Sequence, residues 1–183
     1  MAKKQILNPD ELRNLLDYDP ETGVLTWKPR PASMFPDERA ASRWNARFAG
    51  RPAFATVNGN GYLVGGIAGR MHKAHRVCWA ILHGEWPTVE IDHENGDRTD
   101  NRNANLRAVT PVENHHNKKR PENNTSGVIG VCWHKPSGKW LARIMASGKE
   151  KCLGYFRDIA EAAAARKAAE IELGFHANHG RSA

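Results

Sequence analysis

The feature that most constrains the fold is a strand, a polar loop, a second strand and a helix start in immediate succession. Two short segments are typical of strands, the β-branched Val89–His93 and then Leu106–Val109. Residues 94–105 between them are rich in Asn, Asp and Gly, which favour turns. Thr110-Pro111-Val112-Glu113 then combines a capping box with a proline at the first helical position. The sequence therefore predicts a strand pair followed directly by a helix.

Side chains that can do chemistry gather on this unit. Asp92 and His93 stand at the end of the first strand, and Asn114 stands in the first turns of the helix. Neighbouring residues of a strand point to opposite sides, so the carboxylate and the imidazole lie near each other on different faces. A helix packed on the strand pair returns Asn114 to the same point. We expect one carboxylate, one amide and one imidazole around one phosphate.

The charge of the chain is positive but unevenly spread. The 27 Lys and Arg against 20 Asp and Glu give a net charge of +7, which favours a nucleic acid as partner. Residues 75–119 carry 6 basic and 7 acidic side chains, whereas residues 1–74 and 120–183 each carry a net +4. An acidic middle between basic flanks has a reason to hold Mg²⁺ or Mn²⁺, because the ion neutralises groups that would repel phosphate. We expect one divalent ion per active site.

The middle of the chain resembles the HNH nuclease family, specifically the phage and intron-encoded HNH endonucleases with a ββα-metal site. The motifs that carry the resemblance follow one another in order: His75-Arg76, Asp92-His93, Asn95-Gly96-Asp97-Arg98, Asp100-Asn101-Arg102, Asn105-Leu106-Arg107 and Glu113-Asn114. The resemblance implies hydrolysis of DNA phosphodiester bonds.

The same resemblance implies a role for each matching residue. His93 is the general base and Asn105 orients its imidazole, while Asp92 and Asn114 hold the metal. A neutral imidazole suits the base, because its ordinary pKa near 6.5 lets it take a proton from water at physiological pH. Many relatives have a histidine in place of Asn114, so His115 and His116 are alternative second ligands.

Two of the neighbouring assignments have alternatives. Asn105 alternatively bridges the loop backbone as an Asx turn. Arg76 is a candidate contact to the scissile phosphate, although a structural role for the His75-Arg76 pair is an equal alternative.

The C-terminal region predicts a small sheet with one helix. Three strand-like runs, Val128–Trp133, Lys139–Met145 and Lys151–Phe156, are separated by hairpin turns. Asp158 then caps an alanine-rich helix. A three-stranded sheet with one helix across it is the economical fold for a segment of this length.

This region resembles an AP2 DNA-binding domain. The resemblance is carried by Ser126-Gly127-Val128-Ile129-Gly130-Val131, Gly138-Lys139-Trp140-Leu141-Ala142-Arg143-Ile144, Leu153-Gly154-Tyr155-Phe156 and the helix after them. It implies a sheet that enters the major groove. Strand alternation places Arg143 on one face with Leu141 and Met145, which makes Arg143 the first candidate DNA contact. Lys135, Lys139 and Lys151 follow, with solvated edge charges as the alternative.

The remaining segments complete the expected organisation. The sequence predicts a helix beginning at Asn8-Pro9 and a strand at Val24–Trp27. It then predicts a long, partly irregular loop from Pro29 to Asn60, and a helix over Ala74–Leu82 with a cap at Gly84. The three cysteines form no CxxC pair, which predicts reduced, buried thiols. No apolar run could span a bilayer and no signal peptide is visible, so we expect a cytoplasmic protein without membrane contact. The resemblance to phage proteins implies that this is the cytoplasm of the host cell.

The sequence therefore predicts a modular α+β protein. Its expected parts are an N-terminal accessory region at 1–71, a ββα-metal nuclease core at 72–119, a linker at 120–127 and an AP2-like domain at 128–183. The expected function is a metal-dependent, nicking, site-preferring endonuclease of the homing type, which acts on double-stranded DNA as a monomer or weak dimer. A DNA-binding regulator with an inactive core is the alternative. A zinc-dependent structural or RNA-binding module is disfavoured, because cysteine pairs are missing.

Overall fold

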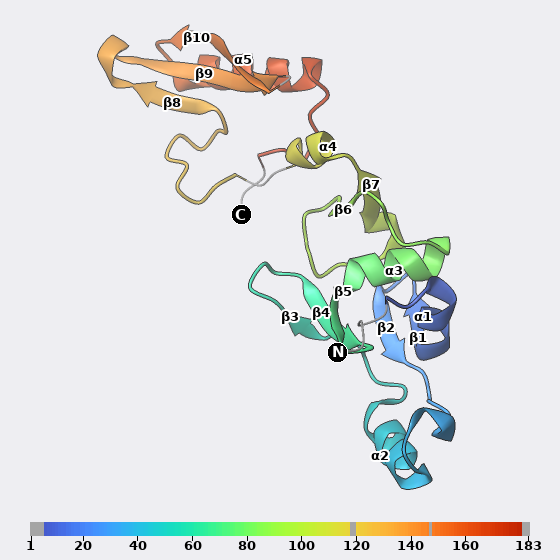
Figure 1. The fold of residues 1–183 in the computed structure, drawn as a ribbon. Coiled ribbons are helices and arrows are strands. Elements are labelled where there is room, and N and C mark those ends of the chain that lie inside the picture. The colour runs from blue at the N-terminus through green and yellow to red at the C-terminus, as the bar shows by residue number, and fades with distance from the viewer. Residues whose placement is uncertain (1–5, 118–119, 147, 181–183) are drawn as a thin grey trace. The chain divides into compact units, whose positions relative to one another are not determined.

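The computed structural model describes residues 6–117, 120–146 and 148–180 and divides the chain into two compact units, Met1–Val109 and Thr110–Ala183 (Figure 1). Each unit combines helices with antiparallel strands, which confirms the α+β class. No described helix has the length and apolar character that crossing a bilayer requires. The predicted linker falls inside the second unit, and the domain limits expected from the sequence stay predictions.

The first unit contains three helices: α1 (Pro9–Leu15), α2 (Glu38–Phe48) and α3 (Ala74–His83). Helix α1 begins at the predicted position with a capping box, in which Asn8 and Glu11 each accept a hydrogen bond from the other's backbone N–H. Helix α3 ends at Gly84, whose φ of +76° is the left-handed conformation that a glycine cap permits. The sequence-based predictions of these two helices are confirmed.

Three small antiparallel sheets complete this unit. They are β1 (Leu16–Asp19) with β2 (Val24–Trp27), β3 (Thr56–Val57) with β4 (Leu63–Ile67) and β5 (Arg70–Lys73), and β6 (Glu90–His93) with β7 (Leu106–Val109). In the last pair, Asp92 lies opposite Arg107 and His93 lies opposite Leu106. A short 3₁₀ turn, η2 (Asn103–Asn105), leads from the polar loop into β7.

One apolar core joins these elements. Its buried side chains come from α1, β1, β2, the segment before β3, β4, α3, β6 and β7: Leu12, Leu16, Leu25, Ala53, Phe54, Ile67, Ala74, Val77, Cys78, Ala80, Ile91 and Leu106. Because Ile91 of β6 and Leu106 of β7 belong to this core, the strand pair is fixed to the N-terminal elements, and with it Asp92 and His93 on β6.

The prediction of a loop from Pro29 to Asn60 is wrong, because this segment contains the 3₁₀ turn η1 (Ala32–Met34) and the three turns of α2. Asp37 caps α2 by accepting a hydrogen bond from the backbone N–H of Ala40. Trp44 of this helix packs on aromatic rings that come from outside it as well as from within: Trp27, Phe35 and Phe48. The helix is thus held by tertiary aromatic contacts that local sequence patterns do not reveal.

The second unit begins with α4 (Pro111–His115), which carries the predicted capping box of Thr110 and Glu113. Strands β8 (Val131–His134), β9 (Lys139–Ala146) and β10 (Lys149–Phe156) form an antiparallel sheet in the order β10-β9-β8. The 3₁₀ turn η3 (Lys135–Ser137) connects β8 to β9. Helix α5 (Ile159–Glu172) begins at Asp158, whose side chain accepts from the N–H of Ala160.

Helix α5 covers one face of this sheet and leaves the other open (Figure 1). Ala142 and Ile144 are buried, whereas Arg143 and Met145 are exposed, which confirms the predicted alternation along β9. The predicted sheet and helix are therefore present, and their identity as an AP2 domain stays a prediction. Of the cysteines, Cys78 is buried as expected, but Cys152 is exposed on β10.

Candidate active site

The candidate site is built on the polar loop that joins β6 to β7. The backbone N–H of Gly96 donates to the carbonyl oxygen of His93 at 2.8 Å, and the N–H of Glu94 donates to that of Asn105 at 2.9 Å. These bonds return the loop to the strand from which it leaves. The side chain of His93 is only 2% exposed, while Asp92 is intermediate, as expected for neighbours on opposite sides of a strand.

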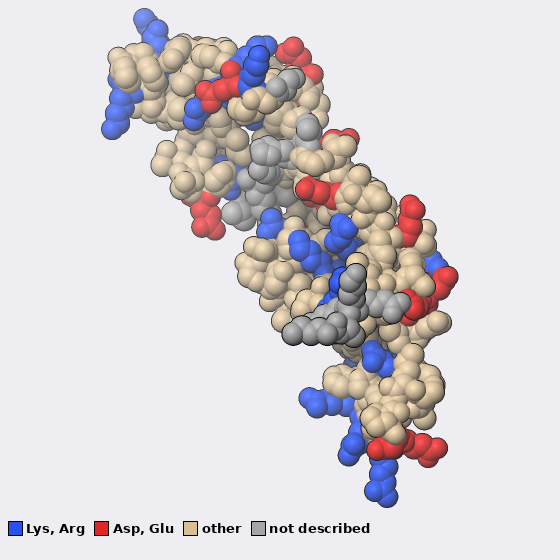
Figure 2. All heavy atoms as spheres, in the orientation of Figure 1, with Lys and Arg blue, Asp and Glu red and all other residues tan. Residues whose placement is uncertain are grey.

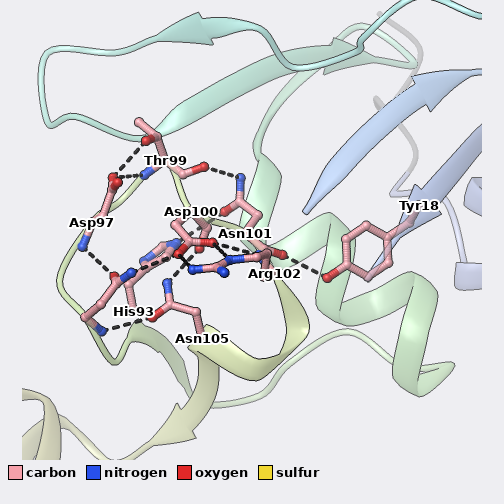
Figure 3. Close-up of polar contacts among 9 residues, drawn as sticks. Tyr18, His93, Asp97, Thr99, Asp100, Asn101, Arg102 and Asn105 are labelled. Atoms are coloured by element: carbon pink, nitrogen blue, oxygen red, sulfur yellow. Dashed lines mark hydrogen bonds and ion pairs between the residues drawn. The ribbon is translucent and has the colours of Figure 1, made fainter. Parts of the chain in front are cut away.

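The imidazole of His93 contacts the side chain of Asn101. Nε2 of the ring lies 3.2 Å from Oδ1 of Asn101, which is itself 2% exposed (Figure 3). An amide oxygen is an acceptor only, so this contact favours the tautomer with its proton on Nε2. In the neutral ring the lone pair then belongs to Nδ1, the nitrogen that can accept a proton.

Asn101 is held in place by the N-terminal elements. The hydroxyl of Tyr18 on β1 donates to the backbone oxygen of Asn101 at 2.8 Å (Figure 3). Gly23, in the turn between β1 and β2, lies so close that an added Cβ would be 2.5 Å from the backbone nitrogen of Arg102 and 2.6 Å from the carbonyl carbon of Asn101. The β1–β2 hairpin therefore supports the residue that contacts His93.

Asn105 contacts the loop rather than the imidazole of His93. Its Oδ1 accepts from the backbone N–H of Asn95 at 2.9 Å, and its Nδ2 donates to the backbone oxygen of Asp100 at 2.8 Å. This is the backbone-bridging alternative predicted for Asn105, while Asn101 takes the position expected for it. Local sequence patterns assign Asn101 no separate role, because a contact across a loop depends on how that loop is folded.

Acidic side chains of the loop stabilise its conformation. Asp100 forms a bidentate ion pair with Arg102, in which the carboxylate oxygens lie 2.8 Å from Nε and 2.6 Å from Nη2. This ion pair lowers the pKa of Asp100 to about 2. Asp97 accepts from both the backbone N–H and the hydroxyl of Thr99 (Figure 3). These carboxylates are ionised at neutral pH and face a loop whose shape they fix.

Two opposing effects act on the pKa of His93. Burial lowers the pKa, whereas the hydrogen bond to Asn101 and the carboxylates of Asp92, Asp97 and Asp100 raise it. Burial is the larger effect, so the pKa lies below the ordinary value for histidine. His93 is therefore neutral at physiological pH, the state that a general base requires.

A second buried histidine lies beside the first. The ring of His75, at the start of α3, meets the ring of His93 edge-on with 5.0 Å between their centres, and Tyr62 lies 5.0 Å and 6.0 Å from the two. Burial, with the neighbouring His93, Lys73 and Arg76, lowers the pKa of His75 to about 3. His75 is thus a neutral side chain that packs against the imidazole of His93.

Two exposed cations flank this aromatic group and were missed by sequence reasoning. Nζ of Lys73 lies 4.1 Å from the ring centre of Tyr62, and the guanidinium carbon of Arg98 lies 4.9 Å from it. Arg98 also donates to the backbone oxygen of Asn60 at 2.7 Å. Arg98 belongs to the Asn95-Gly96-Asp97-Arg98 motif, which was a signal for it, whereas no pattern marked Lys73.

Asp92, the expected metal ligand, forms an ion pair with Arg107 on the opposite strand. Nη2 and Nε of Arg107 lie 2.8 Å and 3.2 Å from Oδ2 of Asp92, whose side chain is 15% exposed. Among the described residues, no cluster of three or more His, Cys, Asp or Glu side chains could bind a metal. A carboxylate and an amide are nevertheless the hard oxygen donors that Mg²⁺ accepts, because this ion keeps several waters and needs few protein ligands.

The other ligand candidates belong to the second unit. Asn114 lies in α4, and its pairing with Asp92 stays a prediction. The side chain of His115 lies outside the described part of the structure. His116 stacks on Phe175 with 3.8 Å between ring centres.

The predicted DNA contacts fall into different settings. Arg76 donates to the backbone oxygens of Pro87 and Val89, so its guanidinium holds the segment before β6. Arg143 and Lys139 share the open face of the C-terminal sheet, where Arg143 pairs with Glu150 at 2.9 Å. The other two candidates lie elsewhere: Lys135 is in η3, and Lys151 pairs with the buried Ile144 and so lies on the α5 side.

Comparison with known proteins identifies the middle of the chain. Residues 72–116 match the HNH endonuclease family, whose members are phosphodiester hydrolases. The chain is also 35% identical over 79 residues to Protein 3.8 of Escherichia phage T7. That similarity covers 43% of this chain and 65% of the relative, so the chain spans somewhat less than two thirds of the relative's length. No solved structure matches the chain.

Proposed function

We propose that the chain is a metal-dependent endonuclease that hydrolyses DNA phosphodiester bonds with His93 as general base. The observation that carries this proposal is a buried, neutral imidazole whose Nε2 contacts Asn101, within a segment that matches the HNH endonuclease family. Burial that keeps the imidazole uncharged and an amide that selects its tautomer are what a base acting on water needs.

The residues of the site divide the reaction between them. Nδ1 of His93 takes a proton from water, the resulting hydroxide attacks phosphorus, and the 3′-oxygen leaves. Asn101 keeps accepting from Nε2–H and so favours the imidazolium that forms. Lys73 and Arg98 are exposed beside the imidazoles, where they attract the phosphate.

The residues expected to hold the metal are Asp92 and Asn114, with Mg²⁺ or Mn²⁺ as the ion. When bound, such an ion would stabilise the charge that develops on the phosphate and the leaving oxygen. The carboxylate of Asp92 is held by Arg107, which also limits its conformational freedom. One base per chain predicts that a monomer nicks one strand and that double-strand breaks need two nicks or two chains.

The C-terminal sheet is proposed to supply site preference. Its open face carries Arg143 and Lys139. An arginine on a sheet face can read guanine in the major groove, and lysines add contacts to phosphate. Chemistry and recognition would then reside in different parts of the chain, as expected for a nicking enzyme of the homing type.

Incubation with supercoiled plasmid tests the proposal. Purified protein with Mg²⁺ or Mn²⁺ should convert the plasmid to nicked circles, and EDTA should prevent the conversion. The matched control is His93→Ala prepared in the same way. Plasmid that is bound but never nicked by the wild-type protein with either metal would contradict the proposal and support a DNA-binding regulator.

A further inference from the structure

Helix α2 carries a row of exposed arginines. Arg39, Arg43 and Arg47 are spaced four residues apart, so they lie on one face of the helix, and Arg51 follows shortly after its end. We call the first three the arginine stripe. It lies outside residues 72–116, the segment that matches the HNH endonuclease family.

The arginine stripe has no acidic partner among the described residues. Other arginines of the unit are neutralised by carboxylates, as Arg102 is by Asp100 and Arg107 by Asp92. The guanidinium of Arg47 lies 5.1 Å from the ring of Phe48, and no ion pair involves any member of the stripe. Like charges at four-residue spacing destabilise a helix, so the other face must hold α2 together.

That other face is anchored to the rest of the unit. The ring of Trp44 lies 5.8 Å from that of Trp27 on β2, and the guanidinium carbon of Arg30 lies 4.0 Å from the same ring of Trp44. The side chain of Asn45 accepts from the backbone N–H of Arg30 at 2.8 Å and donates to its carbonyl oxygen at 2.9 Å. Helix α2 is therefore a fixed support that presents the stripe outward.

The chemistry of the stripe fits a row of phosphates. Arginine binds phosphate through two parallel N–H groups, and successive members of the stripe rise by roughly 6 Å along the helix axis. An anionic membrane is a poorer fit, because Trp44, the largest apolar side chain of α2, packs on Trp27 and Phe35 and is not presented with the arginines.

The place of α2 in the first unit indicates where such a contact falls. Helix α2 lies at the end of the unit away from β6 and β7, and Figure 2 shows basic side chains projecting from that end. We propose that the arginine stripe binds the phosphate backbone of duplex DNA at a position flanking the cleaved bond. This inference rests on the proposed function for the identity of the nucleic acid.

Binding measured without chemistry tests the inference. Full-length protein carrying Arg39→Gln, Arg43→Gln and Arg47→Gln is compared with wild type by fluorescence anisotropy on a DNA duplex, in EDTA, over a series of KCl concentrations. Each lost phosphate contact should make the slope of log affinity against log salt shallower by about 0.9. The ratio of wild-type to variant affinity should therefore change by about 8-fold for each tenfold change in salt. The triple variant should therefore lose up to about 2.7 of slope.

A charge-conserving variant is the matched control. Arg39→Lys, Arg43→Lys and Arg47→Lys keep the three cations and should keep most of the wild-type salt slope. Hydroxyl-radical footprints should show the glutamine variant losing protection on one flank of the DNA while protection elsewhere stays. Single Arg→Gln variants, with folding checked by thermal melting, should each lose about one contact even if the triple variant is unstable.

The outcomes separate this inference from the proposed function. A glutamine variant with the wild-type slope and footprint overturns the role of the stripe, whether or not the enzyme nicks DNA. Absence of nicking by wild type, with a slope that depends on the stripe, contradicts the proposed function alone. Duplex RNA or phosphatidylserine vesicles bound more tightly than DNA, in a manner lost in the glutamine variant, would overturn DNA as the partner.

Discussion

At the scale of single residues, burial sets the charge of His93 and the amide of Asn101 sets its tautomer. Asn101 contacts Nε2, and its own backbone is tied to Tyr18, so the imidazole has one favoured tautomer and little freedom to turn. Burial keeps the ring neutral against the pull of nearby carboxylates. His93 therefore meets both requirements for a general base, because its imidazole is uncharged and the lone pair lies on Nδ1.

Replacement of His93 by alanine should lower the rate of nicking by roughly 10²- to 10⁴-fold, the usual contribution of general-base catalysis. Affinity for DNA in EDTA should be nearly unchanged, because the imidazole acts on water in the transition state. Single-turnover nicking of plasmid measures the rate. His83→Ala, which removes an exposed imidazole at the end of α3, is the control and should stay active. Near-normal nicking by the His93 variant would remove this residue from the mechanism.

Replacement of Asn101 by aspartate should move the acid limb of the pH–rate profile. A carboxylate at this place favours imidazolium, so it raises the pKa of His93, and the neutral base is then lost at a higher pH as the solution is acidified. The rate should fall earlier on acidification than in wild type and recover at higher pH. Asn101→Leu lacks an acceptor and should be slow at every pH. An Asn101→Asp profile identical to wild type would contradict control of His93 by this side chain.

The sequence predicted part of this site for a physical reason. Asp92 and His93 are adjacent on a short strand, so strand geometry alone places them. Asn101 and Lys73 reach the site through the fold of a long loop and through a separate sheet, and local patterns do not contain that information.

At the scale of elements, caps and tertiary contacts explain which predictions held. Helices α1, α3 and α5 have strong local signals at their ends, and all three were predicted. Helix α2 has a cap at Asp37, but its stability depends on the rings of Trp27 on β2 and of Phe35 in the segment before α2. The sequence patterns therefore did not predict this helix. Strands β6 and β7 were predicted because turn-forming residues separate them and a capping box follows β7.

The contact between the β1–β2 turn and the polar loop should be sensitive to one atom. Gly23→Ala places a Cβ 2.5 Å from the backbone of Arg102 at a residue with φ of +75°. Gly50→Ala is the matched control, because its φ is +72° and nothing lies within 4 Å of its added Cβ. Both variants lose about 1–2 kcal/mol to the left-handed backbone, and only Gly23→Ala also suffers the clash.

Urea unfolding should therefore show a larger loss of stability for Gly23→Ala than for Gly50→Ala. Nicking by Gly23→Ala should be slower as well, since its clash displaces the segment that carries Asn101. Equal losses in the two variants would show that the loop adapts without cost and does not depend on the hairpin.

At the scale of the whole molecule, the chain divides into two compact units. Along the chain, the boundary between the two units falls between Val109 and Thr110, within the segment that matches the HNH endonuclease family. In the second unit, the backbone oxygen of His116 accepts from the N–H of His176 at 3.2 Å, and its ring stacks on Phe175. The end of α4 thus depends on the C-terminal segment, so a fragment that stops at the expected linker would lose this support.

Recognition is therefore tested better by single substitutions on the C-terminal sheet. Arg143 lies on the open face, whereas Lys151 lies on the face that α5 covers, although both are exposed. If the open face reads DNA, Arg143→Gln should reduce the preference for the cleaved site over random DNA by roughly 1–3 kcal/mol, and Lys151→Gln should leave that preference unchanged. The loss of the ion pair between Arg143 and Glu150 should hardly affect folding, because both side chains are largely exposed. Competition binding in EDTA with specific and random duplexes measures the preference. An equal reduction of the preference in the two variants would indicate phosphate contacts without base reading. A reduction confined to Lys151→Gln would place the DNA on the opposite face of the sheet.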